Sequence, residues 1–325
     1  MSYTTLLFVF LSFPHPTQGE RNLLLFVSNE LARTITVIDI ATRRPVSEIP
    51  VPGRPRGISA SRDGRHVFVA LSDTIRQKAG PADAIVLIDV ATKRIIDRFP
   101  AGTDPEQFSI SPNGQWIYAS NEDAGLAAVI DLRQHRVAAR LVVGIEPEGV
   151  AISPDGRWAY VTAETSNTVS VIDIAAQRVV ANFLVDARPR AAAFARDSRT
   201  AYVTAELGRT VTVVDVTKHA PIATIAISDS GAKPVGIVLS ADERFAYVAT
   251  GRANSVAVVD LTTRKEVASI PVGRRPWGIE ISPDGSTVYT ANGLSGDVSV
   301  IDTATRRVVA TIKAGAGAWG VALTR

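Results

Sequence analysis

The chain has 325 residues, with 35 Lys and Arg against 32 Asp and Glu, four histidines and no cysteine. The absence of cysteine excludes disulfides, thiolate metal sites and cysteine nucleophiles. A formal charge of +3 without any basic run argues against nucleic-acid binding. Hydrophobic residues make up 46% of the chain and charged residues 21%, which is the balance of a globular protein rather than a disordered one.

The first residues have the pattern of an export signal. Residues 6–13 read LLFVFLSF, an apolar run much shorter than the ~20 residues of a membrane-spanning helix. A segment rich in proline and small residues follows, as in the cleavage region of a signal peptide. We therefore expect residues 1–20 to be a signal peptide, the mature protein to have no membrane span, and its location to be periplasmic or secreted. Because no Lys or Arg precedes the run, a β-strand or a misassigned start remains the alternative.

A repeat of about 42 residues organises the rest of the chain. An aliphatic pair followed by aspartate occurs seven times, with spacings of 50, 42, 42, 42, 45 and 42 residues, at Asp39, Asp89, Asp131, Asp173, Asp215, Asp260 and Asp302. A proline stands sixteen residues after five of these aspartates, at Pro55, Pro105, Pro147, Pro189 and Pro276. Turns such as Ser153-Pro154-Asp155-Gly156 separate the runs, because proline presets φ and glycine tolerates a left-handed backbone.

Each repeat contains four runs rich in β-branched residues, as in 149–153, 158–162, 168–173 and 178–185, which predicts an antiparallel meander. Four strands in 40–45 residues are typical of a propeller blade. The first β-type run of the repeats, 23–28, corresponds to the second strand of a blade. The last run, 319–324, corresponds to the first strand of a blade. The sequence therefore predicts an all-β fold, a seven-bladed β-propeller of four-stranded antiparallel blades. We expect a single domain over residues 21–325, closed by a blade shared between the N- and C-terminal strands.

Loops that enter a first strand or leave a second strand open at one end of the propeller, which we call the top. Both insertions in the repeat, within 72–84 and 228–233, fall there, and loops on a rigid scaffold commonly carry specificity. Residues that flank the repeat prolines should ring the mouth of the central channel. The candidates for binding a ligand or partner are Arg54, Arg56, Glu106, Glu148, Arg188, Arg190, Arg275, Trp277 and Trp319.

A second top-facing set follows the second strands and consists of Glu30, Glu122, Glu164 and Glu206. Two interpretations of the mouth remain open. It is either a solvated ring of mutually paired charges or a funnel that recognises an anionic, planar or peptide-like partner through Arg and Trp.

The sequence predicts no catalytic residue and no metal site. His66, His135 and His219 should lie near the bottom, away from the mouth. A calcium loop, a nucleophile elbow, a phosphate loop and a dinucleotide fingerprint are all missing from the sequence. These features favour a non-enzymatic protein over an enzyme.

The repeat unit, with Tyr160-Val161-Thr162-Ala163 followed by 169–173, resembles that of the YVTN family of seven-bladed propellers. Segments of individual blades, at 102–108, 146–149, 185–190, 233–237, 254–260 and 318–321, resemble propellers associated with catabolism that depends on pyrroloquinoline quinone (PQQ). That resemblance implies an exported periplasmic protein that accompanies quinoprotein alcohol dehydrogenases.

The leading hypothesis is a non-enzymatic periplasmic propeller that supports quinoprotein oxidation. Its top face would bind a quinoprotein dehydrogenase, its cytochrome or a small anionic ligand. No cofactor is firmly predicted, but PQQ, a planar tricarboxylate, is a candidate ligand for Arg56, Arg190 and Arg275, with Trp277 and Trp319 for stacking. The alternatives are a lactonase or lyase, because propellers of this shape host such chemistry, and a surface-layer or structural interaction module.

Overall fold

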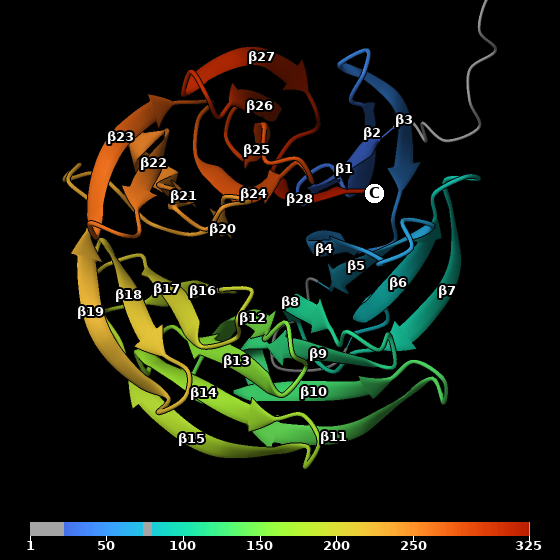
Figure 1. Ribbon diagram of the computed structural model, residues 1–325. Coiled ribbons are helices and arrows are strands. Elements are labelled where there is room, and N and C mark those ends of the chain that lie inside the picture. Colours follow the sequence, from blue (N-terminus) through green and yellow to red (C-terminus); the bar gives the residue numbers. More distant parts are fainter. Residues whose placement is uncertain (1–22, 74–79, 325) are drawn as a thin grey trace, which may run out of the picture.

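The computed structural model describes residues 23–73 and 80–324, which form seven four-stranded antiparallel sheets around a central axis (Figure 1). The predicted all-β propeller is confirmed. Blades 1 to 3 are β4 (Arg54–Ala60), β5 (His66–Ser72), β6 (Ala84–Asp89) and β7 (Arg94–Pro100); β8 (Pro105–Ile110), β9 (Trp116–Asn121), β10 (Leu126–Asp131) and β11 (Arg136–Val142); and β12 (Pro147–Ile152), β13 (Trp158–Ala163), β14 (Thr168–Asp173) and β15 (Arg178–Leu184).

Blades 4 to 6 are β16 (Pro189–Phe194), β17 (Thr200–Ala205), β18 (Thr210–Asp215) and β19 (Ala220–Ala226); β20 (Ile237–Leu239), β21 (Phe245–Ala249), β22 (Ser255–Asp260) and β23 (Lys265–Pro271); and β24 (Pro276–Ile281), β25 (Thr287–Asn292), β26 (Asp297–Asp302) and β27 (Arg307–Lys313). Two short 3₁₀ helices, η1 (Glu122–Ala124) and η2 (Gly251–Ala253), follow second strands in blades 2 and 5.

Blade 7 joins the two ends of the chain. It consists of β28 (Ala318–Leu323), β1 (Leu24–Asn29), β2 (Thr34–Asp39) and β3 (Arg44–Pro50), in that order. The pairing of Leu25 with Leu323 and of Val27 with Val321 shows that both ends enter one sheet, within one residue of the predicted runs. The predicted signal peptide, residues 1–20, lies outside the described residues, and so does part of the first insertion, 74–79. The described residues include no helix long and apolar enough to cross a membrane.

The core lies between neighbouring blades, where aliphatic side chains of one sheet pack against those of the next. Phe26, Ile35 and Val37 of blade 7, for example, share a cluster with Val67 and Val69 of blade 1. All five are fully buried. Because every blade buries one face against each neighbour, the β-branched residues of the repeat contribute to two interfaces.

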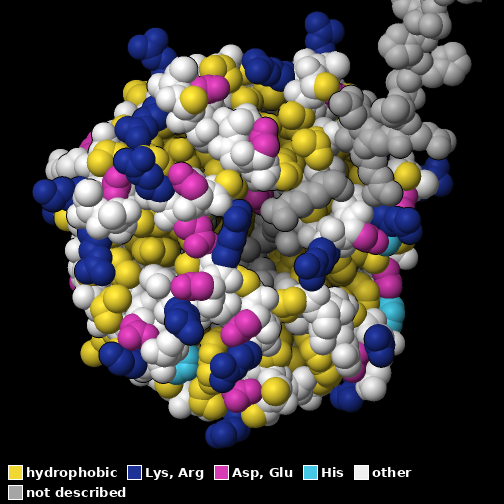
Figure 2. Space-filling model, viewed as in Figure 1, with side chains coloured by type: hydrophobic (Ala, Val, Ile, Leu, Met, Phe, Trp, Pro, Cys, Tyr) yellow, Lys and Arg dark blue, Asp and Glu magenta, His cyan; other side chains and the backbone are white. Residues whose placement is uncertain are grey.

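Glycines let the inner strands approach each other closely around the channel. A Cβ on Gly236 would lie 2.6 Å from the Trp277 carbonyl oxygen, and one on Gly278 would lie 2.6 Å from that of Trp319. Both glycines stand two residues after a repeat proline. Blade 2 carries Gln107 at the same position, so this glutamine is a large side chain in a narrow part of the channel. Figure 2 shows the hollow at the centre of one face, with basic and acidic side chains distributed around it.

In five blades, a serine or threonine hydroxyl of the second strand donates to a carbonyl in or just before the next blade's inner strand. The Thr162 hydroxyl accepts the Gly149 N–H (2.8 Å) in its own blade and donates to the Arg190 carbonyl (3.0 Å) in the next. Ser120 does the same with the Gln107 N–H (3.1 Å) and the Glu148 carbonyl (2.6 Å). The Thr of the repeat unit is therefore a bridge between blades, and it fixes the backbone of residues at the mouth.

Candidate functional site

The structure brings the nine candidate residues together in three groups at the top mouth. Arg54, Arg56 and Glu106 belong to the Arg56 cluster, which we define as these residues with Glu30, Asp104 and Glu122. Glu148, Arg188 and Arg190 form the Arg190 cluster together with Glu164 and Glu206. Arg275, Trp277 and Trp319 form the aromatic group.

In the Arg56 cluster, two arginines of β4 share the carboxylates of the two neighbouring blades, 7 and 2. Nε of Arg56 and Nη1 of Arg54 each lie 3.1 Å from the same Glu30 oxygen. Arg54 also reaches Asp104 at 3.2 Å, and Nη1 of Arg56 contacts Glu106. Burial raises the pKa of Asp104 above its usual value despite these arginines.

The carboxylates of Asp104, Glu106 and Glu122 lie close enough together to hold a cation. The guanidinium of Arg56 already occupies that position, since its Nη1 is 3.8 Å from Asp104 and 3.5 Å from Glu122 and contacts Glu106. A fixed positive charge among the ligand atoms opposes metal binding, so the Arg56 cluster does not fit a metal site.

The Arg190 cluster lies beside it and is more deeply buried. The Arg190 guanidinium is 3.2 Å from Glu148, contacts Glu164, and binds one Glu206 oxygen through Nε and Nη2, each at 2.7 Å. Glu148 is 5% exposed and Glu164 4%, so these charges are paired but not solvated. The charges of this half are therefore mutually paired, as one interpretation of the mouth expected, but Glu148 and Glu164 are buried rather than solvated. Arg188 adds a second ion pair, with Nε 2.7 Å from Glu164.

Burial shifts Glu148 and Glu164 of this cluster toward the protonated form. Burial and the neighbouring Glu148 carboxylate raise the pKa of Glu164 to about 8. Burial also raises the pKa of Glu148, against the opposing charges of Arg190 and Arg56 and a hydrogen bond from Glu164. At neutral pH Glu164 therefore keeps its proton, and in the hydrogen bond of this pair Glu164 is the donor and Glu148 the acceptor.

The aromatic group forms the opposite wall. The rings of Trp277 and Trp319 are 5.9 Å apart, and Trp319 is 8% exposed. The guanidinium groups of Arg190 and Arg275 lie 4.9 Å and 5.0 Å from the Trp277 ring centre. Since cations already stack on Trp277, stacking of a planar ligand on this ring would have to displace one of them.

Four residues at the mouth have a strained backbone conformation. The residues directly before four repeat prolines have positive φ: Asp104 (44°), Glu146 (55°), Arg188 (62°) and Arg275 (56°). Non-glycine residues in this region cost about 1–3 kcal/mol each and gather at functional sites. Three of these four side chains belong to the groups defined above.

Two parts of the site were not singled out by sequence. The sequence names Glu164 and Glu206 only as members of the top-facing set, and because the equivalent Glu30 and Glu122 have the same residue type, nothing marks these two as partners of Arg190. Gln107 could have been found, because the other six blades carry Gly or Ala at its position. It lines a cavity of about 200 Å³ in the channel together with Glu148, Arg190 and both tryptophans.

Comparison with known proteins points to an enzyme family. A family model described as "Lactonase, 7-bladed beta-propeller" matches residues 176–314, and one described as "Cytochrome D1 heme domain" matches 77–218. Each covers less than half of the chain. A search of curated proteins finds no match.

Solved structures share the fold at low identity. A putative 6-phosphogluconolactonase of Bacteroides fragilis NCTC 9343 is 18% identical, with a TM-score of 0.78 over 96% of this chain and 100% of its own. The periplasmic gluconolactonase PpgL of Pseudomonas aeruginosa is 22% identical, with a TM-score of 0.77 over 93% of this chain and 99% of its own. Hydrazine synthase of Kuenenia stuttgartiensis is also 22% identical, with a TM-score of 0.77 over 90% of this chain and 99% of its own.

These matches correct two predictions. The prediction of a non-enzymatic accessory protein of quinoprotein oxidation is wrong, and so is the preference against an enzyme, because the lactonase model and the gluconolactonase structures support the enzymatic alternative. The missing histidines misled the prediction, since a buried carboxyl pair can carry acid–base chemistry without them. The family resemblance is confirmed as a seven-bladed propeller and no further. PQQ as ligand and a quinoprotein or cytochrome partner stay untested predictions.

The haem suggested by the second family model does not fit the mouth. Haem iron needs an axial His, Met, Cys or Tyr ligand, and none lies in the three groups. Of the described histidines, His135 stacks on Phe99 and His219 hydrogen-bonds to the Tyr160 hydroxyl (2.9 Å). His66 lines a cavity at the other end of the channel.

Proposed function

We propose that this protein is a lactonase-type hydrolase that opens a cyclic ester at the Arg190 cluster. The observation that carries the proposal is the pair formed by Glu148 and Glu164, two buried carboxyls on one guanidinium, of which Glu164 has a pKa of about 8. Lactone hydrolysis needs a base for water and an acid for the leaving oxygen, and this pair offers both at neutral pH. The match of the lactonase family model supports the same reaction class.

The ionised Glu148 carboxylate would take a proton from water as the water oxygen bonds to the lactone carbonyl carbon. The bond between that carbon and the ring oxygen then breaks, and the leaving oxygen receives the Glu164 proton. The product is an open-chain hydroxy acid, and a proton passing from Glu148 to Glu164 restores the pair. The charge of Arg190 opposes the negative charge that develops on the carbonyl oxygen.

We further propose that the enzyme works in the periplasm. The apolar run at 6–13 and the resemblance to exported propellers support this location, and the similar gluconolactonase of Pseudomonas aeruginosa is a periplasmic protein. Fractionation of the native host, with detection of the mature chain in the periplasmic extract, tests this location.

The activity is tested on a panel of five- and six-membered lactones that includes δ-gluconolactone. Acid release is followed with a pH indicator, and spontaneous hydrolysis is subtracted. We expect Glu148→Gln and Glu164→Gln each to lower kcat by about 10²–10⁴. The matched control is Glu48→Gln, because Glu48 is exposed on the outer strand β3. Wild-type rates equal to buffer on every lactone, or full activity in both cluster variants, would reject the proposal.

The pH profile gives an independent test of the roles. Since Glu164 must be protonated to act as the acid, kcat/KM should fall above pH about 8, the pKa of this group. A profile that rises through pH 8 without a decrease would contradict the assignment of Glu164 as the acid.

A further inference from the structure

A cavity lies at the bottom of the channel, at the opposite end from the mouth. Its volume is about 700 Å³, within the ~300–1,000 Å³ typical of small-molecule sites. Residues of β4, β5 and β8, together with the turns that follow β4 and β8, form most of its wall. Glu280 is the one described residue that lines both this cavity and the channel cavity above it.

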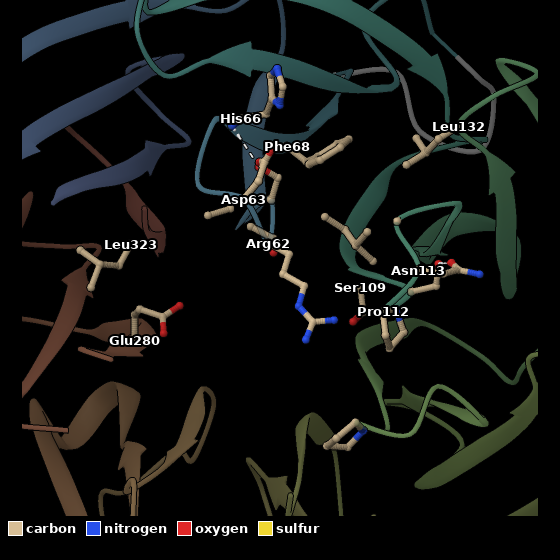
Figure 3. Close-up of a pocket in the computed structure, with 17 residues that line it drawn as sticks. Arg62, Asp63, His66, Phe68, Ser109, Pro112, Asn113, Leu132, Glu280 and Leu323 are labelled. Carbon is tan, nitrogen blue, oxygen red and sulfur yellow. Dashed lines mark hydrogen bonds between the residues drawn. The ribbon is translucent and has the colours of Figure 1, made fainter. Parts of the chain in front are cut away.

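An arginine projects into this cavity without a structural need for it. Arg62 occupies the position that proline takes in three other bottom turns, Pro112, Pro154 and Pro283. The turn nevertheless has the same bonds as theirs, with the Gly64 N–H donating to the Ser61 carbonyl (2.9 Å). Figure 3 shows the Arg62 guanidinium reaching toward the middle of the cavity.

The charge of Arg62 is not neutralised by the turn itself. The Asp63 carboxylate accepts the Ser61 hydroxyl (2.6 Å) and the Arg65 N–H (3.0 Å), so it is directed back into its own turn. None of the ion pairs formed among residues 23–73 and 80–324 includes Arg62. A guanidinium in this setting favours an anion, above all a carboxylate that accepts two of its N–H groups.

The rest of the wall suits hydroxyl groups beside an apolar surface. The Glu280 carboxylate faces Arg62 from another wall (Figure 3) and can accept hydrogen bonds from hydroxyls. Ser59 and Ser109, on neighbouring inner strands, add hydroxyls of their own, and Phe68 and Leu323 supply buried apolar walls.

We propose that this lower cavity is a second binding site, for a small hydroxycarboxylate whose carboxylate pairs with Arg62 and whose hydroxyls face Glu280. This ligand class includes the products of lactone hydrolysis, but the inference goes beyond the proposed function and depends on the cavity alone. It places a ligand at the end of the channel opposite the Arg190 cluster.

The test is calorimetric titration of the full chain with gluconate, and with sorbitol as the probe that has hydroxyls but no carboxylate. We expect gluconate to bind and sorbitol not to. The Kd for gluconate should rise about tenfold or more in Arg62→Ala. Arg62→Pro should do the same while keeping the turn, since three sister turns carry proline. The matched control is Arg196→Ala, because Arg196 is exposed at the equivalent turn of blade 4 and does not line the cavity.

Absence of gluconate binding, or unchanged affinity in Arg62→Pro, would overturn the inference. Loss of binding in Arg275→Ala with retention in Arg62→Pro would also overturn it, because the ligand would then occupy the top mouth. Lactone turnover is measured separately in wild type. Gluconate binding that depends on Arg62 in a protein without turnover would reject the proposed function and leave the second site standing.

Discussion

The hydroxyl bridge at Ser120 offers the sharpest test of how the scaffold positions the proposed active site. Ser120 is fully buried, accepts the Gln107 N–H at 3.1 Å and donates to the Glu148 carbonyl at 2.6 Å. Ser120→Ala removes the bridge and leaves both groups short of a partner, which costs about 1–3 kcal/mol. For a chain of this size the melting temperature should fall by roughly 2–6 °C.

The same substitution at Ser28 is the matched control. Ser28 is also fully buried, and it accepts the Gly320 N–H (2.9 Å) and donates to the Arg56 carbonyl (2.7 Å). Both variants should lose similar stability. Only Ser120→Ala releases the backbone of Glu148, so we expect only this variant to lower kcat strongly.

The pH profile separates positioning from simple destabilisation. The Glu148 charge is one cause of the raised pKa of Glu164. If Glu148 moves away, that pKa falls, and the alkaline decline of kcat/KM should begin below pH 8 in Ser120→Ala but not in Ser28→Ala. Equal losses of kcat in the two variants, with identical profiles, would refute the reasoning that Ser120 positions Glu148.

Three further predictions concern stability. Deletion of residues 319–325 removes most of β28, so β1 becomes an open edge and the ring should melt at a clearly lower temperature; an unchanged melting curve would contradict the shared blade. Gly278→Ala places a Cβ 2.6 Å from the Trp319 carbonyl and should cost about 1–3 kcal/mol by chemical denaturation, whereas Gly231→Ala, in an exposed top loop where the nearest atom is 3.3 Å from the added Cβ, should cost much less. The pKa of Glu164 is raised to about 8 from 4.5, so between these pH values the folded state binds a proton that the unfolded state has lost, and stability should decrease as pH rises from about 4.5 to 8. Glu164→Gln should flatten this slope when melting temperatures are measured across that range. An equally steep slope in the variant would show that other groups cause it.

Sequence periodicity predicted the architecture because a propeller repeats one supersecondary unit. The spacing of the aspartates marks the end of each third strand, and the runs at both termini complete one blade, as the pairing of Leu25 with Leu323 shows. The same spacing places the residues after each repeat proline, such as Glu148 and Arg190, at one level of the channel. These features depend on backbone position, which a repeat specifies.

Pairing and protonation at the mouth could not be predicted in this way. The glutamates Glu30, Glu122, Glu164 and Glu206 are equivalent in sequence, yet burial and the nearby Glu148 carboxylate raise the pKa of Glu164 to about 8. Burial of a side chain depends on neighbouring loops and rotamers rather than on its place in the repeat. Arg62 illustrates the same limit at the bottom, where the sequence suggests only a weaker turn and the structure shows a charge reaching into a cavity.

The balance of charge at the mouth explains why acid–base chemistry arises there without histidine. The Arg56 and Arg190 clusters hold four arginines and seven carboxyls: Glu30, Asp104, Glu106, Glu122, Glu148, Glu164 and Glu206. Three carboxyls are therefore in excess, and the pKa is raised at three of them, Asp104, Glu148 and Glu164. Because buried negative charge without a partner is unfavourable, protons rather than metal ions offset part of the excess. A group that holds such a proton near pH 8 can release it to a leaving oxygen, so the acid that the proposed lactone opening requires follows from a shortage of arginine.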